Sequence, residues 1–280
     1  MNLIFLLTRQ LRYAKLSAKK STNDFLHHIW KHTVGLVSII LLSSFLAACA
    51  TQKQQAFEVE NARARARAHN DLGFVYFQQR NFEVALEEFT IATNIDPTFG
   101  FAYNGLGLVH SALGQDVLAE KNFKQAVQVE PNNSESHNNY GNFLCSRGRV
   151  DESIKEFLAA VKNPLYATPA MAYTNAGICS LRKQDVRNAE VYFQRALQAE
   201  PLFHSAAYQL ALIQFNRNEI TNAKITLQNA MLSRPGPELL WLSIRIARLL
   251  GNRDDESSYA LELRSQYPDS EQAKLLQSGN

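Results

Sequence analysis

Three cysteines are the side chains of this 280-residue chain best suited to covalent chemistry. Cys145 and Cys179 lie 34 residues apart, whereas Cys49 directly follows an apolar run. Two cysteines form a disulfide where their side chains meet in an oxidising compartment, and the alternative is a pair of small buried apolar residues. No Cys-x-x-Cys pair and no cluster of His and Cys occurs, so we expect neither a metal site nor a cofactor.

The residues before Cys49 predict a signal peptide. Val34 to Ala48 is a run of fifteen uncharged residues that follows a basic segment, and it is short for a membrane-spanning helix. The ending Leu46-Ala47-Ala48-Cys49 is similar to a bacterial lipobox, in which the cysteine is acylated, for example with palmitate, and becomes the first residue of the mature chain. We therefore expect residues 1–48 to be removed, although a cysteine placed there by chance is the alternative.

Ala50 bears on the address of such a lipoprotein. In bacterial lipoproteins an aspartate after the cysteine tends to retain the protein at the inner membrane, and Ala50 stands there instead. The resemblance therefore implies a lipid-anchored protein on the periplasmic face of the outer membrane. Residues 49–65, polar between Gln52 and Asn61, are expected to tether the lipid to the folded part.

Cleavage after residue 48 reverses the sign of the net charge. The whole chain has 29 Lys and Arg against 26 Asp and Glu, and the leader holds six of the former and one of the latter. The mature chain therefore has 23 basic and 25 acidic residues, a net charge of −2. Without a basic excess, we expect no nucleic-acid partner.

The histidines and carboxylates form no recognisable catalytic set. His69 and His137 lie 68 residues apart, twice the period described next, so they are expected to be structural. No Gly-x-Ser-x-Gly, phosphate-binding loop or His-Glu-x-x-His pattern occurs. We expect neither enzymatic activity nor a small-molecule substrate.

A 34-residue period organises the rest of the chain. It is carried by small residues, aromatic residues and prolines at fixed distances from each other: Gly73, Gly107, Gly141 and Gly177; Ala85, Ala119, Ser153 and Ala189; Phe89, Phe123, Phe157 and Phe193; Pro97, Pro131 and Pro201. Each unit reads as two helices that approach closely at the small residues and end at the proline. One pair cannot bury its apolar face alone, so neighbouring pairs must stack.

This pattern resembles the tetratricopeptide repeat. The resemblance implies an all-α fold, a tetratricopeptide-repeat superhelix (an α-solenoid) of about six helix pairs over residues 66–270, followed by a C-terminal tail at 271–280. Units start at Ala66, Gly100, Ser134, Ala170 and His204, and a degenerate sixth pair runs from Pro237 to Pro268. The third unit is two residues longer, through Asn163 to Pro169.

The same resemblance places a partner-binding groove on the first helix of each unit. Its expected lining is the set Arg67, Asn70, Phe74, Phe77, Phe101, Asn104, Leu108, Asn138 and Asn142. The asparagines could hold an extended peptide backbone and the aromatic residues could form apolar pockets. The alternative is that several of these side chains pack against neighbouring helices. The resemblance also places Cys145 and Cys179 on adjacent first helices. A disulfide between them and a pair of free thiols remain the two alternatives.

Several longer strings resemble the PilF/PilW lipoproteins of type IV pilus biogenesis. They are Asn138–Cys145, Asn163–Tyr166, Leu240–Arg248, Gly251–Asp254 and Ser258–Ala260. The resemblance implies a pilotin, which binds the secretin subunit, brings it to the outer membrane and promotes its multimerisation. It favours the first units, around Phe74 to Leu108, as the binding surface. The alternative function is a scaffold lipoprotein for cell-wall hydrolases or for outer-membrane barrel assembly.

Overall fold

The computed structural model describes residue 30 and residues 52–279. Cys49 and all of the expected signal peptide except Trp30 lie outside these residues, so those expectations stay predictions. The chain divides into two compact units, residues 1–62 and 63–280. In the first unit, residues 52–61 of the expected tether are helical and exposed. Within the described part of the chain, no helix has the length and apolarity needed to cross a membrane.

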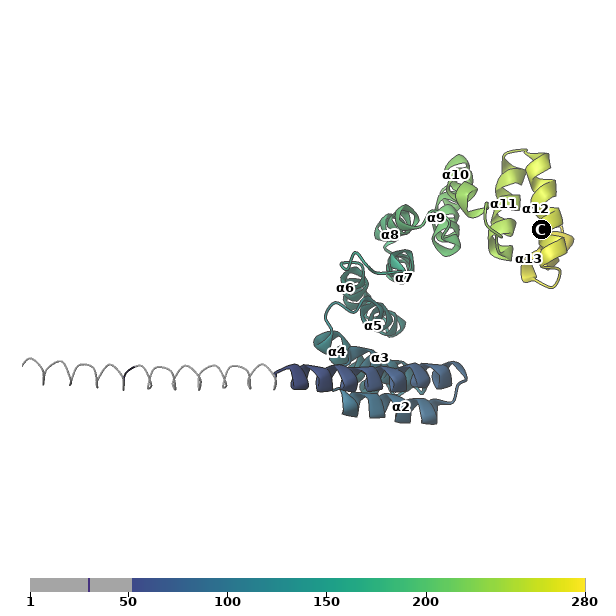
Figure 1. Ribbon diagram of the computed structural model, residues 1–280. Coiled ribbons are helices and arrows are strands. Elements are labelled where there is room, and N and C mark those ends of the chain that lie inside the picture. The colour runs from purple at the N-terminus through teal and green to yellow at the C-terminus, as the bar shows by residue number, and fades with distance from the viewer. Residues whose placement is uncertain (1–29, 31–51, 280) are drawn as a thin grey trace, which may run out of the picture. The chain divides into compact units, whose positions relative to one another are not determined.

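The second unit is built from helices, and its described residues contain no strand (Figure 1). A helix over residues 63–78 opens it. The helices that follow are α2 (Phe82–Ile95), α3 (Gly100–Ala112), α4 (Asp116–Val129), α5 (Ser134–Ser146), α6 (Val150–Ala160), α7 (Pro169–Arg182), α8 (Val186–Ala199), α9 (His204–Asn216), α10 (Ile220–Ala230), α11 (Pro237–Leu249), α12 (Arg253–Gln266) and α13 (Glu271–Gln277). The helix starts at Gly100, Ser134 and His204 fall where the repeat register predicts them.

Each repeat is a pair of helices, A and B, and in the first four repeats an aromatic ring of helix B lies on a glycine of helix A. Helix A is residues 63–78, α3, α5, α7, α9 or α11, and the helix after it is helix B. A Cβ atom added at Gly107 would come within 2.7 Å of the Phe123 ring, and one at Gly141 within 2.7 Å of the Phe157 ring. Phe123 and Phe157 are each only 1% exposed. The repeating glycine is therefore the space in which the repeating phenylalanine packs.

Neighbouring repeats share their cores, which makes the unit a stack rather than a row of separate pairs. Phe123 of α4 packs against Tyr140 and Phe143 of α5, the first helix of the next repeat, with ring centroids 5.9 and 5.4 Å apart. Helix α3 also contacts α5, and α5 contacts α7, so successive A helices lie side by side. This arrangement confirms the all-α repeat fold that the 34-residue period predicts.

The C-terminal segment differs from the expected tail. Residues Glu271–Gln277 form helix α13, and Ser270 caps its start by accepting a hydrogen bond from the Ala273 backbone N–H. Ala273 is fully buried beside Leu240 and Ile244 of α11. The segment covers apolar surface of the sixth repeat, as a capping helix does.

The turn between helix A and helix B uses a left-handed backbone in every repeat. Gly114, Gly148 and Gly251 have φ of 71°, 75° and 67°, while Arg80, Gln184 and Asn218 take φ near 60° at the same repeat position. Glycine adopts this region without steric cost, whereas the other residues do not. The glycines at 34-residue spacing were a visible signal of this turn that the sequence analysis did not use.

Candidate functional site

The nine expected groove residues divide into three groups by exposure. Arg67 and Asn142 are exposed, the apolar members Phe74, Phe77, Phe101 and Leu108 are half-buried, and the asparagines are buried, as Asn70 (4%), Asn104 (0%) and Asn138 (3%) show. The alternative considered above, packing against neighbouring helices, therefore applies to much of the set. The following contacts show what each group does.

The buried asparagines connect successive A helices. Asn139 Nδ2 donates to Asn104 Oδ1 at 3.3 Å, and Asn175 Nδ2 donates to Asn138 Oδ1 at 3.0 Å. The two Oδ1 atoms thus each accept a hydrogen bond inside the stack and belong to buried side chains, so they are poorly placed to receive a peptide N–H. Sequence reasoning missed the partners Asn139 and Asn175 because the pairing depends on the register between helices.

The first repeat lacks this connection. Its Asn70 Oδ1 is buried without a hydrogen-bond partner among the described residues. The repeat position that carries Asn139 and Asn175 in later units carries Gly105 here, and Gly105 has no side chain with which to donate. A Cβ atom at Gly105 would approach Phe89 to 2.3 Å, so the packing of Phe89 excludes an asparagine at that position.

The half-buried apolar groove residues are shared between the groove and the core. Phe74 meets Phe89 edge-on with ring centroids 5.1 Å apart, Phe77 lies 5.8 Å from Phe82, and Phe101 lies 5.5 Å from Phe99. One side of each ring therefore packs within the repeats, and the remaining exposed part is what a partner can contact.

A disulfide joins Cys145 and Cys179, the pair that the sequence analysis left open between bonded and free. The sulfurs are bonded at 2.19 Å and the Cα atoms lie 5.9 Å apart. Cys145 is on α5 and Cys179 on α7, so the bond connects the A helices of two successive repeats. Both residues are buried, at 7% and 0% exposure.

The longer connection after the third repeat forms one wall of a pocket. Leu165 N–H donates to Asn163 Oδ1 at 3.0 Å, Tyr166 N–H donates to the Asn163 carbonyl at 3.1 Å, and Asn163 Nδ2 donates to the Asn132 carbonyl at 3.4 Å. These bonds hold the turn beside the start of α5. The pocket, about 460 Å³ in volume, is lined by this turn, by Phe101 of α3, by the first two turns of α5 and by Met171 of α7.

His137 lies beside this pocket and is held by two acceptors. Its Nδ1 lies 2.6 Å from Glu156 Oε2 and its Nε2 lies 2.9 Å from the Pro131 carbonyl oxygen. Neither acceptor can donate, so only the imidazolium form satisfies both. Burial opposes this charge, but the bonds to Glu156 and Pro131 outweigh burial and raise the pKa of His137 above its ordinary value.

The raised pKa of His137 predicts a pH-dependent contribution to stability. A folded pKa above the unfolded value of 6.5 stabilises the fold fully below that value, and this stabilisation is lost as the pH rises through the folded pKa. We expect His137→Gln to lower the melting temperature more at about pH 5 than at about pH 9. The control is His110→Gln, because His110 Nδ1 bonds the neutral side chain of Gln115. Equal losses for His137→Gln at both pH values would contradict the assignment.

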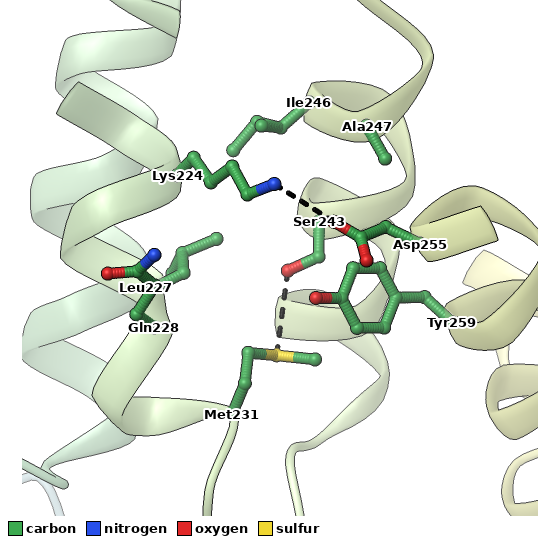
Figure 2. Close-up of a pocket in the computed structure, with 9 residues that line it drawn as sticks. All are labelled: Lys224, Leu227, Gln228, Met231, Ser243, Ile246, Ala247, Asp255 and Tyr259. Carbon is green, nitrogen blue, oxygen red and sulfur yellow. Dashed lines mark hydrogen bonds and ion pairs between the residues drawn. The ribbon is translucent and has the colours of Figure 1, made fainter. Parts of the chain in front are cut away.

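A second pocket lies between helices α10, α11 and α12 (Figure 2). Lys224 Nζ reaches Asp255 Oδ2 at 2.9 Å across it, and the Ser243 hydroxyl donates to Met231 Sδ at 3.5 Å. The cation and the anion that line this pocket neutralise each other, and most other lining side chains are apolar. The pocket therefore presents no unpaired charge to a ligand. We interpret it as part of the packing between the last two repeats.

The described residues hold no group of three or more His, Cys, Asp or Glu side chains that could bind a metal ion. What the geometry offers is a peptide-sized surface with amide and apolar groups on successive A helices. Such a surface is suited to binding a protein segment.

Comparison with known proteins identifies the repeat and a set of relatives. Tetratricopeptide repeat models match residues 102–133 and 122–155. The type IV pilus assembly protein PilF of Pseudomonas aeruginosa is 29% identical over 243 residues, which cover 85% of this chain and 96% of PilF. An uncharacterised protein of Haemophilus influenzae is 26% identical over 152 residues, covering 54% of this chain and 83% of its own length.

Solved structures agree with the sequence comparison. The structure of Pseudomonas aeruginosa PilF superposes with a TM-score of 0.66 and 27% identity, covering 79% of this chain and 100% of that one. PilW, described as a widely conserved type IV pilus biogenesis factor, superposes with a TM-score of 0.60 and 28% identity, covering 75% and 97%. Tetratricopeptide-repeat proteins are scaffolds for protein interactions, and no catalytic family is indicated. This chain, all-helical in the residues that the structure describes, is a tetratricopeptide-repeat protein homologous to the type IV pilus biogenesis proteins PilF and PilW.

Proposed function

We propose that this chain is an outer-membrane lipoprotein that acts as a pilotin in type IV pilus biogenesis. It binds the secretin subunit, localises it to the outer membrane and promotes its multimerisation. The observation that carries the proposal is the homology to PilF, which extends over 96% of that protein's length. Relatedness over nearly the full length supports a shared role better than a shared repeat does, because unrelated functions use the same fold.

Two parts of the chain divide the work in this proposal. Acylated Cys49 fixes the protein to the membrane, and stable anchoring requires more than one acyl chain. The repeats bind the unassembled secretin through the exposed parts of their A helices. The half-buried rings of Phe74, Phe77 and Phe101 support a partner surface there because they leave apolar area uncovered.

Deleting the gene tests the role. We expect the loss of heat-resistant secretin multimers and of surface pili, with both restored by the intact gene. Normal levels of secretin multimers and of surface pili after deletion would contradict the proposal. If the protein instead co-purifies with cell-wall hydrolases or with barrel-assembly components and not with secretin, the scaffold alternative replaces it.

The anchor has a separate test. We expect Cys49→Ala to prevent acylation and to leave the protein outside the outer-membrane fraction, since the proposed anchor is the lipid on Cys49. Mass spectrometry of the N-terminal peptide and membrane fractionation provide the readouts. Outer-membrane localisation of the Cys49→Ala protein at the normal level would refute the lipid anchor. Gln54→Ala is the matched control, because it changes an exposed residue of the expected tether and leaves Cys49 in place.

A further inference from the structure

The pocket beside the Asn163–Thr168 turn has one free amide donor and one free amide acceptor. Asn138 uses its Oδ1 to accept from Asn175, and Asn139 uses its Nδ2 to donate to Asn104. Asn138 Nδ2 and Asn139 Oδ1 have no hydrogen-bond partner among the described residues, and neither is one of the fully buried unsatisfied atoms. Both residues line the pocket. One donor and one acceptor match the C=O and N–H that an extended peptide residue presents.

The start of α5 contributes a further unsatisfied group. Ser134 lines the same pocket, is 6% exposed, and its Oγ is buried without a partner among the described residues. A buried hydroxyl without a partner is costly, so native structures rarely retain one without a reason. Ser134 thus adds a buried unsatisfied hydroxyl beside the two free amide groups of α5.

The apolar part of the pocket lining is held in place. Leu165 is 88% exposed although its turn is fixed by the hydrogen bonds of Asn163, and Met171 is 39% exposed on α7. Phe101 and Tyr166 are half-buried between them and the helices. Because the turn is already ordered, a partner that covers Leu165 loses little conformational entropy in the protein.

The charged residue in the lining of the pocket is acidic. Glu135 is exposed, lines the pocket and has no ion-pair partner among the described residues. The nearby Glu130 is paired with Arg63 and accepts a hydrogen bond from Asn133, so its charge is already compensated. Glu135 is therefore the carboxylate that a cation on a partner would meet.

We propose that this pocket binds an extended segment of the client protein that places one apolar side chain next to a lysine or arginine. The apolar side chain packs among Phe101, Leu165 and Met171. Asn138 Nδ2 and Asn139 Oδ1 bond the backbone of that residue, and Glu135 pairs with the neighbouring cation. The inference rests on the proposed function for the identity of the client, the secretin subunit.

The test measures binding of short overlapping peptides from the secretin of the same genome to the full-length protein by fluorescence anisotropy. We expect the bound peptides to share an apolar residue beside a basic one. Leu165→Asp should weaken their binding about tenfold or more, because it places a charge where the bound peptide would cover apolar surface. Glu135→Gln should weaken it about two- to fivefold and reduce its salt dependence, since the lost ion pair is exposed.

Matched controls separate the pocket from general effects on the fold. Leu232 is 79% exposed outside the pocket and Glu87 is exposed on α2, so Leu232→Asp and Glu87→Gln should leave binding unchanged. Circular dichroism and melting temperatures should match for all four variants, because the altered side chains are exposed.

Two outcomes overturn the inference without touching the pilotin role. In one, peptides bind but Leu165→Asp and Glu135→Gln bind them as tightly as the unaltered protein. In the other, no secretin peptide binds although deletion of the gene abolishes secretin multimers. Normal multimers after deletion contradict the pilotin role instead. The effect of the two variants on peptide affinity then still shows whether this pocket binds the peptide.

Discussion

Replacing Phe123 with alanine is expected to lower the free energy of unfolding by about 3 to 5 kcal/mol. Phe123 is 1% exposed, its ring fills the space over Gly107, and it packs against Tyr140 and Phe143 of the next repeat. The substitution therefore removes contacts within one repeat and between two repeats. Because Gly107 carries no side chain, it cannot fill the cavity left by the ring.

Chemical denaturation followed by circular dichroism measures this effect. Val117→Ala is the control, because Val117 lies on the same helix and is 84% exposed, so its loss should stay within about 0.5 kcal/mol. Repeat arrays need not unfold in one step, so the Phe123→Ala transition is expected to broaden or divide near α4 and α5. A loss below about 1 kcal/mol would show that the phenylalanine does not couple the repeats as described.

Removing the disulfide is the second large expected effect. Replacing both Cys145 and Cys179 with alanine should destabilise the fold by about 2 to 4 kcal/mol, because the bond closes a 34-residue loop and restricts the unfolded chain. That loop contains α6 and the Asn163–Thr168 turn, so the bond also ties α5 to α7 on two sides of the pocket.

A reductant separates the bond from the packing of the sulfur atoms. The melting temperature of the unaltered protein should fall when a reductant is present, whereas that of the double alanine variant should not change. Mass spectrometry of non-reduced peptides checks the bond directly. Free thiols at Cys145 and Cys179 in the purified protein, or equal melting temperatures with and without reductant, would contradict the expected stabilisation.

Much of the fold was predictable because its signals are local. The small residues, aromatic residues and prolines recur at a fixed period, and the first four units pack a phenylalanine on a glycine in the same way. The predicted contact between the helices at Gly107 and its equivalents is confirmed by the rings that lie on them. The predicted longer third unit also has its counterpart, in the turn before α7.

The candidate site was less predictable because it depends on pairings between repeats. Asn104 and Asn138 were expected to face a peptide, yet their Oδ1 atoms accept hydrogen bonds from Asn139 and Asn175. The residue type at position 5 of a repeat does not show what the facing helix offers. The C-terminal segment likewise looked like a tail until α13 was seen to bury Ala273 against α11.

The sequence by itself determined the repeat, its register and the positions that must be small or aromatic, because helix periodicity and close approach restrict residue type within a single unit. The tertiary structure alone decided which polar groups form hydrogen bonds inside the stack and which have no partner there. It brought Phe101, Asn139 and Leu165 to one pocket, and it bonded Cys145 to Cys179. The physical reason is that hydrogen-bond satisfaction and burial are properties of pairs distant in sequence, which the register between neighbouring helices sets.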